Sequence, residues 1–269
     1  MHWVQVNQNG VPVFGVLAGE TITLTALAWA DVLAGRTPDA VGTLALAEAD
    51  LLAPLGRPGK IVAIGQNYWD HCREQNVAPP ERPIIFTKFT SAINHPGGTI
   101  RWSPALTQKV DFEAELAVVI GRTARRVAAA EALAYVFGYT VANDVTARDL
   151  QRGDGQWVRG KSLDTSCPLG PALVTADAIP DPQTLAIRSR LNGRPMQDSS
   201  TREMIFSVAH LIAFCSAAFT LEPGDVLLTG TPDGVGVFRD PPIFMGDGDV
   251  IEVEVEGIGR LRNVCRTEA

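Results

Sequence analysis

Acidic residues alternate with small or apolar ones between Asp111 and Glu115. If this segment is a strand, its side chains alternate between two faces, so Asp111, Glu113 and Glu115 share one face. Carboxylates crowded on one face repel each other unless water or a cation screens them. The segment runs directly into the apolar residues 116–120, which is typical of an interior strand. The pattern therefore indicates either a solvent-facing strand edge or a cation site.

A further carboxylate, Asp144, follows another predicted apolar strand at residues 139–142. Ligands that are all oxygen suit Mg²⁺, Mn²⁺ or Ca²⁺ better than zinc. A site made of three carboxylates leaves positions that water or a chelating substrate can fill. Spacing alone predicts such a site but makes Asp111 as good a ligand as Glu113 or Glu115.

Two other pairs have the spacing of neighbours on a helical turn. His71 and Glu74 can touch, and a carboxylate beside an imidazole orients it as a general base; an ordinary surface pair is the alternative. Arg148 and Gln151 can position a carboxylate or a water, although a structural salt bridge for Arg148 fits nearly as well. Lys161 stands alone, and a lone lysine is usually solvated.

Residues 230–236 are rich in glycine but lack the Gly-Lys-Ser/Thr end of a phosphate-binding loop. They predict a tight turn, or a turn whose backbone N–H groups and Thr231 hydroxyl hold a substrate carboxylate. The chain has no Gly-x-Ser-x-Gly segment, and no cysteine has a histidine partner in the sequence. Both observations argue against hydrolysis by a serine or cysteine nucleophile.

Composition limits the classes of partner. A formal net charge of −7 argues against nucleic acid or an anionic membrane as a partner, and favours a small-molecule substrate. Residues 1–5 show no secretory signal, and residues 205–221 are too short and too polar to span a membrane, so we expect a cytoplasmic protein. The four cysteines lie far apart and are expected to be reduced, buried thiols.

The elements that must position these residues are mostly strands. The 269 residues can bury a full core, and 25 Gly with 18 Pro favour many turns. A hairpin around residues 7–10 and a helix over 25–33 predict a small N-terminal α/β module, and the Pro and Gly residues between 54 and 59 suggest that it ends there. We therefore predict domains at 1–57 and 58–269.

In the second domain, apolar runs predict strands and two segments predict helices. The fold class is α+β, mainly β. The longer helix, 207–219, is expected to be capped near Ser199, Ser200 and Thr201. The expected strands are 60–64, 84–86, 116–120, 138–141, 226–229 and 250–255, and the shorter expected helix is 131–137.

Five segments, in this order, resemble the fumarylacetoacetate hydrolase superfamily between Gly65 and Val264, within its branch of acylpyruvate hydrolases, oxaloacetate decarboxylases and isomerase-decarboxylases. The matching segments are 65–74 (GQNYWDHCRE), 111–116 (DFEAEL), 143–151 (NDVTARDLQ), 161–162 (KS) and 229–236 (TGTPDGVG). Phe89 departs from the pattern, because relatives often carry proline there, beside the substrate.

The resemblance implies a mixed β-sandwich roll, a homodimer, and a Mg²⁺ or Mn²⁺ site made by Glu113, Glu115 and Asp144, with Ca²⁺ as a substitute. It leaves Asp111 a supporting role. It also implies that His71 and Glu74 are catalytic residues on a lid. It places Lys161 beside the metal, where a cation can stabilise an enolate.

Three functions follow as hypotheses. The first is hydrolysis of a carbon–carbon bond in a 2,4-dioxo acid of the acylpyruvate or fumarylpyruvate type, through a metal-bound enolate. The second is decarboxylation of oxaloacetate, or keto–enol isomerisation or decarboxylation of a 2-oxo acid in aromatic catabolism. The third is a catalytically silent, metal-stabilised binding protein, which the set of His71, Glu74 and Lys161 disfavours.

Overall fold

The computed structural model describes residues 1–268, so Ala269, the last residue of the second predicted domain, lies outside the described part. Its strands form a twelve-stranded sheet, a five-stranded sheet and a two-stranded pair. The large sheet contains β1 His2–Gln8, β2 Val11–Ala18, β3 Thr21–Thr25, β4 Ala40–Ala45, β5 Leu51–Leu52, β6 Ile61–Gly65, β7 Ile84–Lys88, β8 Ile93–Asn94, β11 Ala114–Ile120, β12 Val136–Asn143, β14 Cys167–Thr175 and β17 Val226–Leu228. The five-stranded sheet contains β9 Thr99–Trp102, β15 Ala186–Leu191, β16 Arg194–Ser200, β18 Val250–Val255 and β19 Gly259–Thr267, and β10 Val110–Asp111 pairs with β13 Thr146–Ala147.

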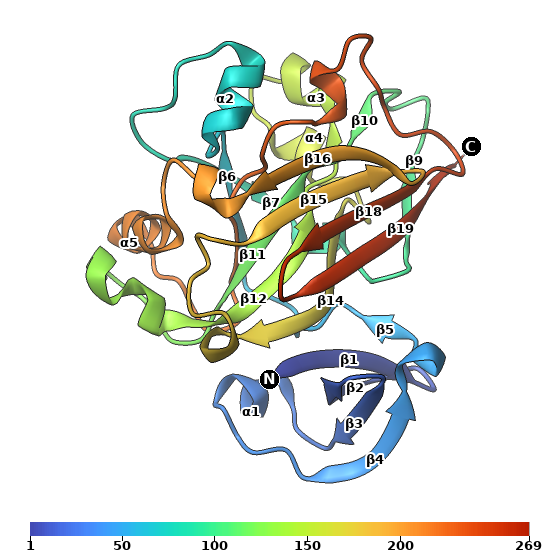
Figure 1. Ribbon diagram of the computed structural model, residues 1–269, viewed down its shortest axis with the longest axis vertical. Helices are drawn as coiled ribbons and strands as arrows, with labels where there is room; N and C mark the ends of the chain where they lie inside the picture. The colour runs from blue at the N-terminus through green and yellow to red at the C-terminus, as the bar shows by residue number, and fades with distance from the viewer. Residues whose placement is uncertain (269) are drawn as a thin grey trace.

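Both main sheets are mixed. Most neighbouring strands are antiparallel, but β6 runs parallel to β17, β8 to β14, and β9 to β19. The strands β1 to β4 extend the large sheet, because β1 pairs with β14 where Trp3 lies opposite Leu173. Figure 1 shows these first strands at one end of the molecule and β15, β18 and β19 lying across β11, β12 and β14. The architecture confirms the predicted fold class, mainly β with few helices.

Strand β11 is buried along its whole length, as its continuous apolar sequence predicts. Leu116 and Val118 belong to the core between the two sheets, together with Val253 of β18. Ala117 and Val119 belong to a second cluster on the opposite face of the large sheet. The alternation of a strand thus places β11 between two cores, which fixes it firmly beside the site described below.

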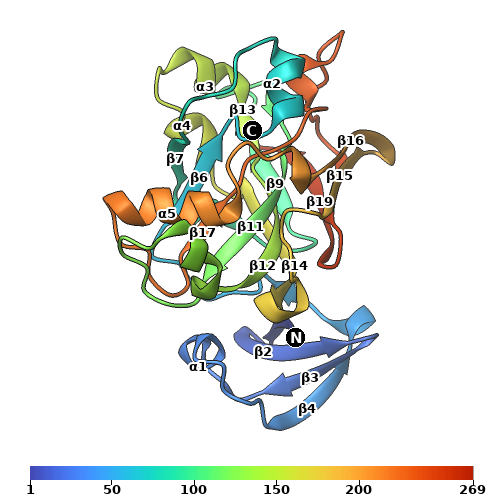
Figure 2. The ribbon, with the colours of Figure 1, turned by 60° about the vertical axis from the view of Figure 1, so that its left-hand side comes forward.

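The helices are short and few. They are α1 Trp29–Leu33, α2 Trp69–Gln75, α3 Arg148–Gly153, α4 Val158–Lys161 and α5 Val208–Ala218, with 3-10 turns at Leu46–Glu48, Thr90–Ala92, Ala129–Tyr135, Ala176–Ala178, Thr201–Glu203 and Gly236–Phe238. Two views agree that α2, α3 and α4 gather at the end of the molecule opposite β1 to β4 (Figures 1 and 2). Within residues 1–268 no helix is long and apolar enough to cross a membrane.

Three local predictions were wrong. The helix expected over 25–33 is confined to α1, because Thr25 ends β3 and pairs with Ala40 of β4. The helix expected over 131–137 is a 3-10 turn that ends where Val136 opens β12. The longer helix lies within its expected range, but its cap was misplaced. The N-cap is Ser207, whose side chain accepts a hydrogen bond from His210 N, and not one of residues 199–201, which lie upstream.

Candidate active site

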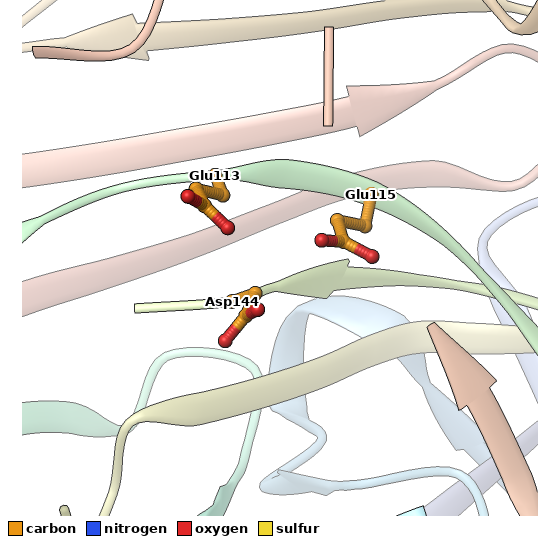
Figure 3. A group of neighbouring side chains, drawn as sticks. All are labelled: Glu113, Glu115 and Asp144. Carbon is orange, nitrogen blue, oxygen red and sulfur yellow. The ribbon is translucent and has the colours of Figure 1, made fainter. Parts of the chain in front are cut away.

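Three carboxylates meet where β11 and β12 lie side by side. Glu113 precedes β11, Glu115 lies in it, and Asp144 directly follows β12. The register pairs Ala114 with Asn143, and Asp144 N donates to Glu113 O at 2.9 Å. One carboxylate oxygen from each residue lies within 4.8 Å of the others, and all three side chains are buried (Figure 3). This triad is the ligand set that the family resemblance implied.

Asp111 lies apart from the triad. The segment expected to be one strand is broken at Phe112 and Glu113, between β10 and β11. Asp111 instead accepts hydrogen bonds from Gly236 N at 2.8 Å, Val237 N at 3.1 Å and Arg148 Nε at 2.8 Å. The expectation of one shared acidic face was wrong, because the break turns Asp111 toward the loop that carries Gly236.

Two buried lysines neutralise the triad. Lys161 Nζ, at the end of α4, lies 2.6 Å from Glu113 Oε2 and 2.7 Å from Asp144 Oδ2. Lys88 Nζ, at the end of β7, lies 2.7 Å from Asp144 Oδ1 and also donates to Val145 O at 3.2 Å and to Lys161 O. Asp144 therefore has one ammonium group on each carboxylate oxygen.

Arg148, the first residue of α3, is also committed to protein groups. Its Nε donates to Asp111, its Nη1 donates to Gln151 Oε1 at 3.1 Å, and its Nη2 lies 2.7 Å from Glu113 Oε1. The pairing of Arg148 with Gln151 confirms their helical-turn spacing. The guanidinium holds Asp111 and Glu113 in place, which agrees with the alternative of a structural salt bridge.

The carboxylates of Glu113 and Glu115 differ sharply in their electrostatic surroundings. Burial alone would raise the pKa of Glu113, but Lys161 and Arg148 lower that pKa to about 2. Burial raises the pKa of Glu115 well above its usual value, and the nearby charges of Asp144 and Glu113 raise it further. Glu115 is thus the member of the triad whose negative charge is least compensated.

The donor set fits a divalent cation. In the buried cluster four carboxylates face three cationic side chains, which leaves a formal charge of −1. A cation bound by Glu113, Glu115 and Asp144 would offset the electrostatic repulsion between Glu115 and the other two carboxylates. Hard oxygen ligands of this kind can bind a divalent metal ion. The members of the cluster are Asp111, Glu113, Glu115 and Asp144 with Lys88, Arg148 and Lys161.

His71 and Glu74 form the expected pair on α2. His71 Nδ1 lies 3.1 Å from Glu74 Oε2, and the histidine side chain is buried against the Phe238 ring, with ring centroids 5.8 Å apart. Glu74 is fixed in turn, because its Oε1 accepts a hydrogen bond from Gly234 N at 2.9 Å. Since Nδ1 faces the carboxylate, Nε2 is the ring nitrogen left for exchange of a proton.

The glycine-rich turn uses its backbone N–H groups on the protein's own carboxylates. Gly230 N donates to Glu115 Oε2 and Gly236 N to Asp111 Oδ1, both at 2.8 Å, beside the contact of Gly234 with Glu74. A Cβ at Gly236 would lie 1.9 Å from Ile243 O, so glycine is required there. Thr231 Oγ1 donates to Ala114 O at 2.9 Å. The turn therefore supports the site, and substrate binding by Thr231 stays a prediction.

A cavity of about 500 Å³ opens over the triad. Every residue predicted for the site lines it except Glu74, which lies behind His71, and Asp144, which lies beneath the two lysines. Its lining residues are Ile64, Gly65, Gln66, His71, Gln75, Val77, Phe86, Glu113, Glu115, Arg148, Gln151, Arg152, Gly155, Trp157, Lys161, Thr231, Val237 and Phe238.

Sequence reasoning missed two features of this site. Lys88 was assigned no role from the sequence, although a lysine directly after the apolar run 84–86 was a signal, since a lysine that is buried needs a carboxylate partner. The aromatic wall was missed as well. Trp157 packs edge-on against Phe86 at 5.4 Å between centroids, and a Cβ at Gly65 would lie 2.3 Å from the Trp157 ring. Neither contact leaves a trace in residue spacing.

Two protein-family models match the chain. Residues 60–266 match the family described as fumarylacetoacetate (FAA) hydrolase C-terminal. Residues 1–54 match one described as Rv2993c-like, N-terminal. The two matched ranges lie on either side of the predicted boundary near residue 57.

Named relatives and solved structures are similar over most of the chain. The oxaloacetate tautomerase FAHD2A, mitochondrial, of Bos taurus is 53% identical over 218 residues, which cover 80% of this chain and 69% of the relative. A fumarylacetoacetate hydrolase from Exiguobacterium antarcticum superimposes with a TM-score of 0.91 at 39% identity over 100% of both chains. A 2-hydroxyhepta-2,4-diene-1,7-dioate isomerase from Mycobacterium marinum superimposes with a TM-score of 0.85 at 38% identity, over 100% of this chain and 99% of that one.

Proposed function

The chain belongs to the fumarylacetoacetate hydrolase family, and from that membership we propose that it interconverts the keto and enol forms of a 2-oxo acid such as oxaloacetate. The relatives just described include an oxaloacetate tautomerase and an isomerase of a 2-hydroxydienoate, which is the enol of a 2-oxo acid. This favours the second of our three hypotheses over hydrolysis. The observation that carries the proposal is the His71–Glu74 pair, whose histidine lines the same cavity as Glu113 and Glu115 of the acidic triad.

Tautomerisation moves one proton from C3 of the keto acid to the oxygen on C2. His71 Nε2 accepts the C3 proton as general base, while Glu74 holds the ring through Nδ1. The protonated imidazole then gives that proton to the C2 oxygen, and the reverse reaction retraces both transfers, so the reaction needs no attacking water. Lys161, buried beside Glu113 and Asp144, offers positive charge where the enolate oxygen develops.

We propose Mg²⁺ or Mn²⁺ as the cation held by Glu113, Glu115 and Asp144, with Ca²⁺ as a substitute. When bound, the cation supplies a Lewis acid that makes the C3 proton of a chelating 2-oxo acid more acidic. Arg148 and Gln151 position the Glu113 carboxylate in this scheme. The aromatic wall of Phe86 and Trp157 excludes water from the reacting carbon.

Hydrolysis of an acylpyruvate is the second candidate. It is favoured by the same His71–Glu74 pair, which could activate a water molecule for attack on the distal carbonyl. Both reactions pass through an enolate of the 2-oxo acid. They differ in whether a carbon–carbon bond breaks, and that difference is measurable.

The test is a product assay on the purified protein with Mg²⁺ or Mn²⁺. Ultraviolet absorbance follows ketonisation of enol-oxaloacetate, CO₂ release follows its decarboxylation, and chromatography follows cleavage of acetylpyruvate and fumarylpyruvate. Ketonisation well above the buffer rate without CO₂ release supports the proposal. Cleavage of a dioxo acid as the dominant activity would restore the hydrolase, and turnover of none would defeat both.

Two expectations about context accompany this proposal. A homodimer is expected by analogy with the family, and sedimentation of the purified protein tests it. A cytoplasmic location is likewise only proposed, and the FAHD2 relatives carry the word mitochondrial in their names. Fractionation of the producing cells decides the location.

A further inference from the structure

Three cationic side chains line the cavity, and two of them are committed to protein carboxylates. Arg148 pairs with Asp111 and Glu113, and Lys161 pairs with Glu113 and Asp144. The third, Arg152, lines the same cavity and is exposed to solvent. Throughout residues 1–268 no carboxylate lies within ion-pair distance of Arg152. The cavity thus has one cation whose charge the protein leaves unmatched.

The position of Arg152 is set by α3. Arg148 and Arg152 are four residues apart on that helix, so they share one face, with Cβ atoms about 5–6 Å apart. Arg148 lies at the buried end, against the acidic triad, and Arg152 lies one turn farther out. Its guanidinium lies 5.9 Å from the centroid of the Phe238 ring, and that ring packs against His71. The Phe238 ring therefore contacts both Arg152 and His71, the proposed general base.

We propose that Arg152 binds a second carboxylate of the substrate, at the end opposite the 2-oxo group, and so makes the enzyme selective for 2-oxo dicarboxylic acids. This inference rests on the proposed enolisation of a 2-oxo acid at the triad. It adds the class of substrate and the residue that recognises it.

Charge and geometry support this assignment. The net charge of −7 repels a dianion, so a second carboxylate gains most from a local cation that is not already paired. A guanidinium suits a carboxylate because it donates two parallel hydrogen bonds. One helical turn between the triad end and Arg152 is of the same order as the separation of the carboxylates in a four-carbon diacid. Stacking on Phe238 holds the guanidinium in place, which lowers the entropic cost of binding.

The experiment compares oxaloacetate with its 4-methyl ester, which keeps the 2-oxo acid and removes the distal charge. Exchange of the C3 protons for deuterium, followed by NMR with Mg²⁺ present and corrected for the buffer rate, reports enolisation of both compounds. Arg152→Gln should lower kcat/KM for oxaloacetate about 10- to 100-fold, mainly through KM, and leave the ester unchanged. Arg152→Lys should recover part of the loss, because lysine keeps the charge without the forked geometry.

The matched control is Arg159→Gln, since Arg159 is an exposed arginine nearby that pairs with Asp154 and does not line the cavity. It should leave both substrates unaffected. Equal losses on oxaloacetate and ester in Arg152→Gln, or no loss on either, would overturn the assignment of Arg152.

A binding measurement separates this inference from the proposed function. If the wild type enolises neither compound, the proposed function fails. Protection against heat unfolding by each compound, with Mg²⁺ present, then tests Arg152 alone. A preference for oxaloacetate over the ester that disappears in Arg152→Gln supports the carboxylate site without catalysis. If oxaloacetate and the ester protect the wild type equally, the proposed carboxylate site at Arg152 is overturned.

Discussion

Lys88 Nζ donates a hydrogen bond to Asp144 Oδ1 at 2.7 Å, and neither side chain is exposed to solvent. The lysine closes β7, whereas the aspartate follows β12, so the pair joins two strands that are not neighbours in the sheet. Lys161 lies against the other oxygen, Oδ2, at 2.7 Å. The two lysines together offset the cost of burying this carboxylate, which is proposed as a metal ligand.

Replacing Lys88 by Met should destabilise the protein by about 3–5 kcal/mol, because it leaves a buried aspartate short of one cation. Urea unfolding of the wild type and the variant measures the difference in the free energy of unfolding. Arg188→Met is the control, since Arg188 pairs with Asp198 on the surface and should cost less than about 1 kcal/mol. Equal effects of the two substitutions would contradict this account of Lys88.

Replacing Glu115 by Gln should separate cation binding from folding. The affinity for Mn²⁺, measured by calorimetry, should fall at least about 100-fold, because a ligand is lost. The free energy of unfolding without metal should equal or exceed that of the wild type, since the substitution removes the least compensated charge. The new amide keeps an oxygen that can accept the hydrogen bond from Gly230 N. Unchanged Mn²⁺ affinity would remove Glu115 from the site.

Replacing Glu113 by Gln should have the opposite effect on folding. It leaves Lys161 and Arg148 with one carboxylate fewer, so the metal-free variant should be less stable than the wild type at neutral pH. The pKa of Glu113 is lowered from 4.5 to about 2. The ionised Glu113 therefore contributes its full share to the free energy of unfolding above pH 4.5, and this contribution is lost as the pH falls through about 2. The stability gap between wild type and variant, followed by unfolding from about pH 7 to pH 2, should therefore narrow only below pH 4.5.

Replacing His71 by Ala should lower the rate of enolisation by about 10²- to 10⁴-fold, because the general base is lost. Mn²⁺ affinity should not change, since His71 lies on α2 and the proposed metal ligands lie on or beside β11 and β12. His210→Ala serves as the control, because His210 stacks between Phe206 and Phe214 on α5. A variant that loses activity only together with Mn²⁺ binding would place His71 in the metal site instead.

The cysteines should resist alkylation in the folded protein. All four are free and buried, as the sequence led us to expect. Burial raises the pKa of Cys215 and of Cys265 to about 12, so both remain neutral thiols at about pH 8 to 9, and the thiolate is the reactive form. Mass spectrometry after iodoacetamide treatment should find these two residues modified only once urea is added. Rapid labelling of the native protein in the same buffer would show that the cores around them open.

The sequence predicted local structure wherever one periodicity dominated. The unbroken apolar run at 116–120 required an interior strand, and the Asn-Gly turn at residues 9 and 10 required a hairpin, since both adopt a positive φ. It failed where competing signals met. The helix expected over 25–33 begins only at Trp29, because Thr25 is the β-branched last residue of β3 and pairs with Ala40 of β4.

For the site, the sequence by itself determined which chemistry was available: oxygen ligands for a hard cation, a His–Glu pair at helical spacing, and lysine and arginine nearby. It could not decide which carboxylates meet, because Asp111 and Asp144 lie far apart in the chain and either could complete a triad with Glu113 and Glu115. The tertiary structure decided, since pairing of β11 with β12 places Asp144 beside Glu113, while the break after β10 gives Asp111 to Arg148. The roles of Lys88 and Arg152 depend on which charges pair in space: Lys88 meets Asp144, whereas Arg152 meets no carboxylate among residues 1–268, and spacing along the chain does not determine either outcome.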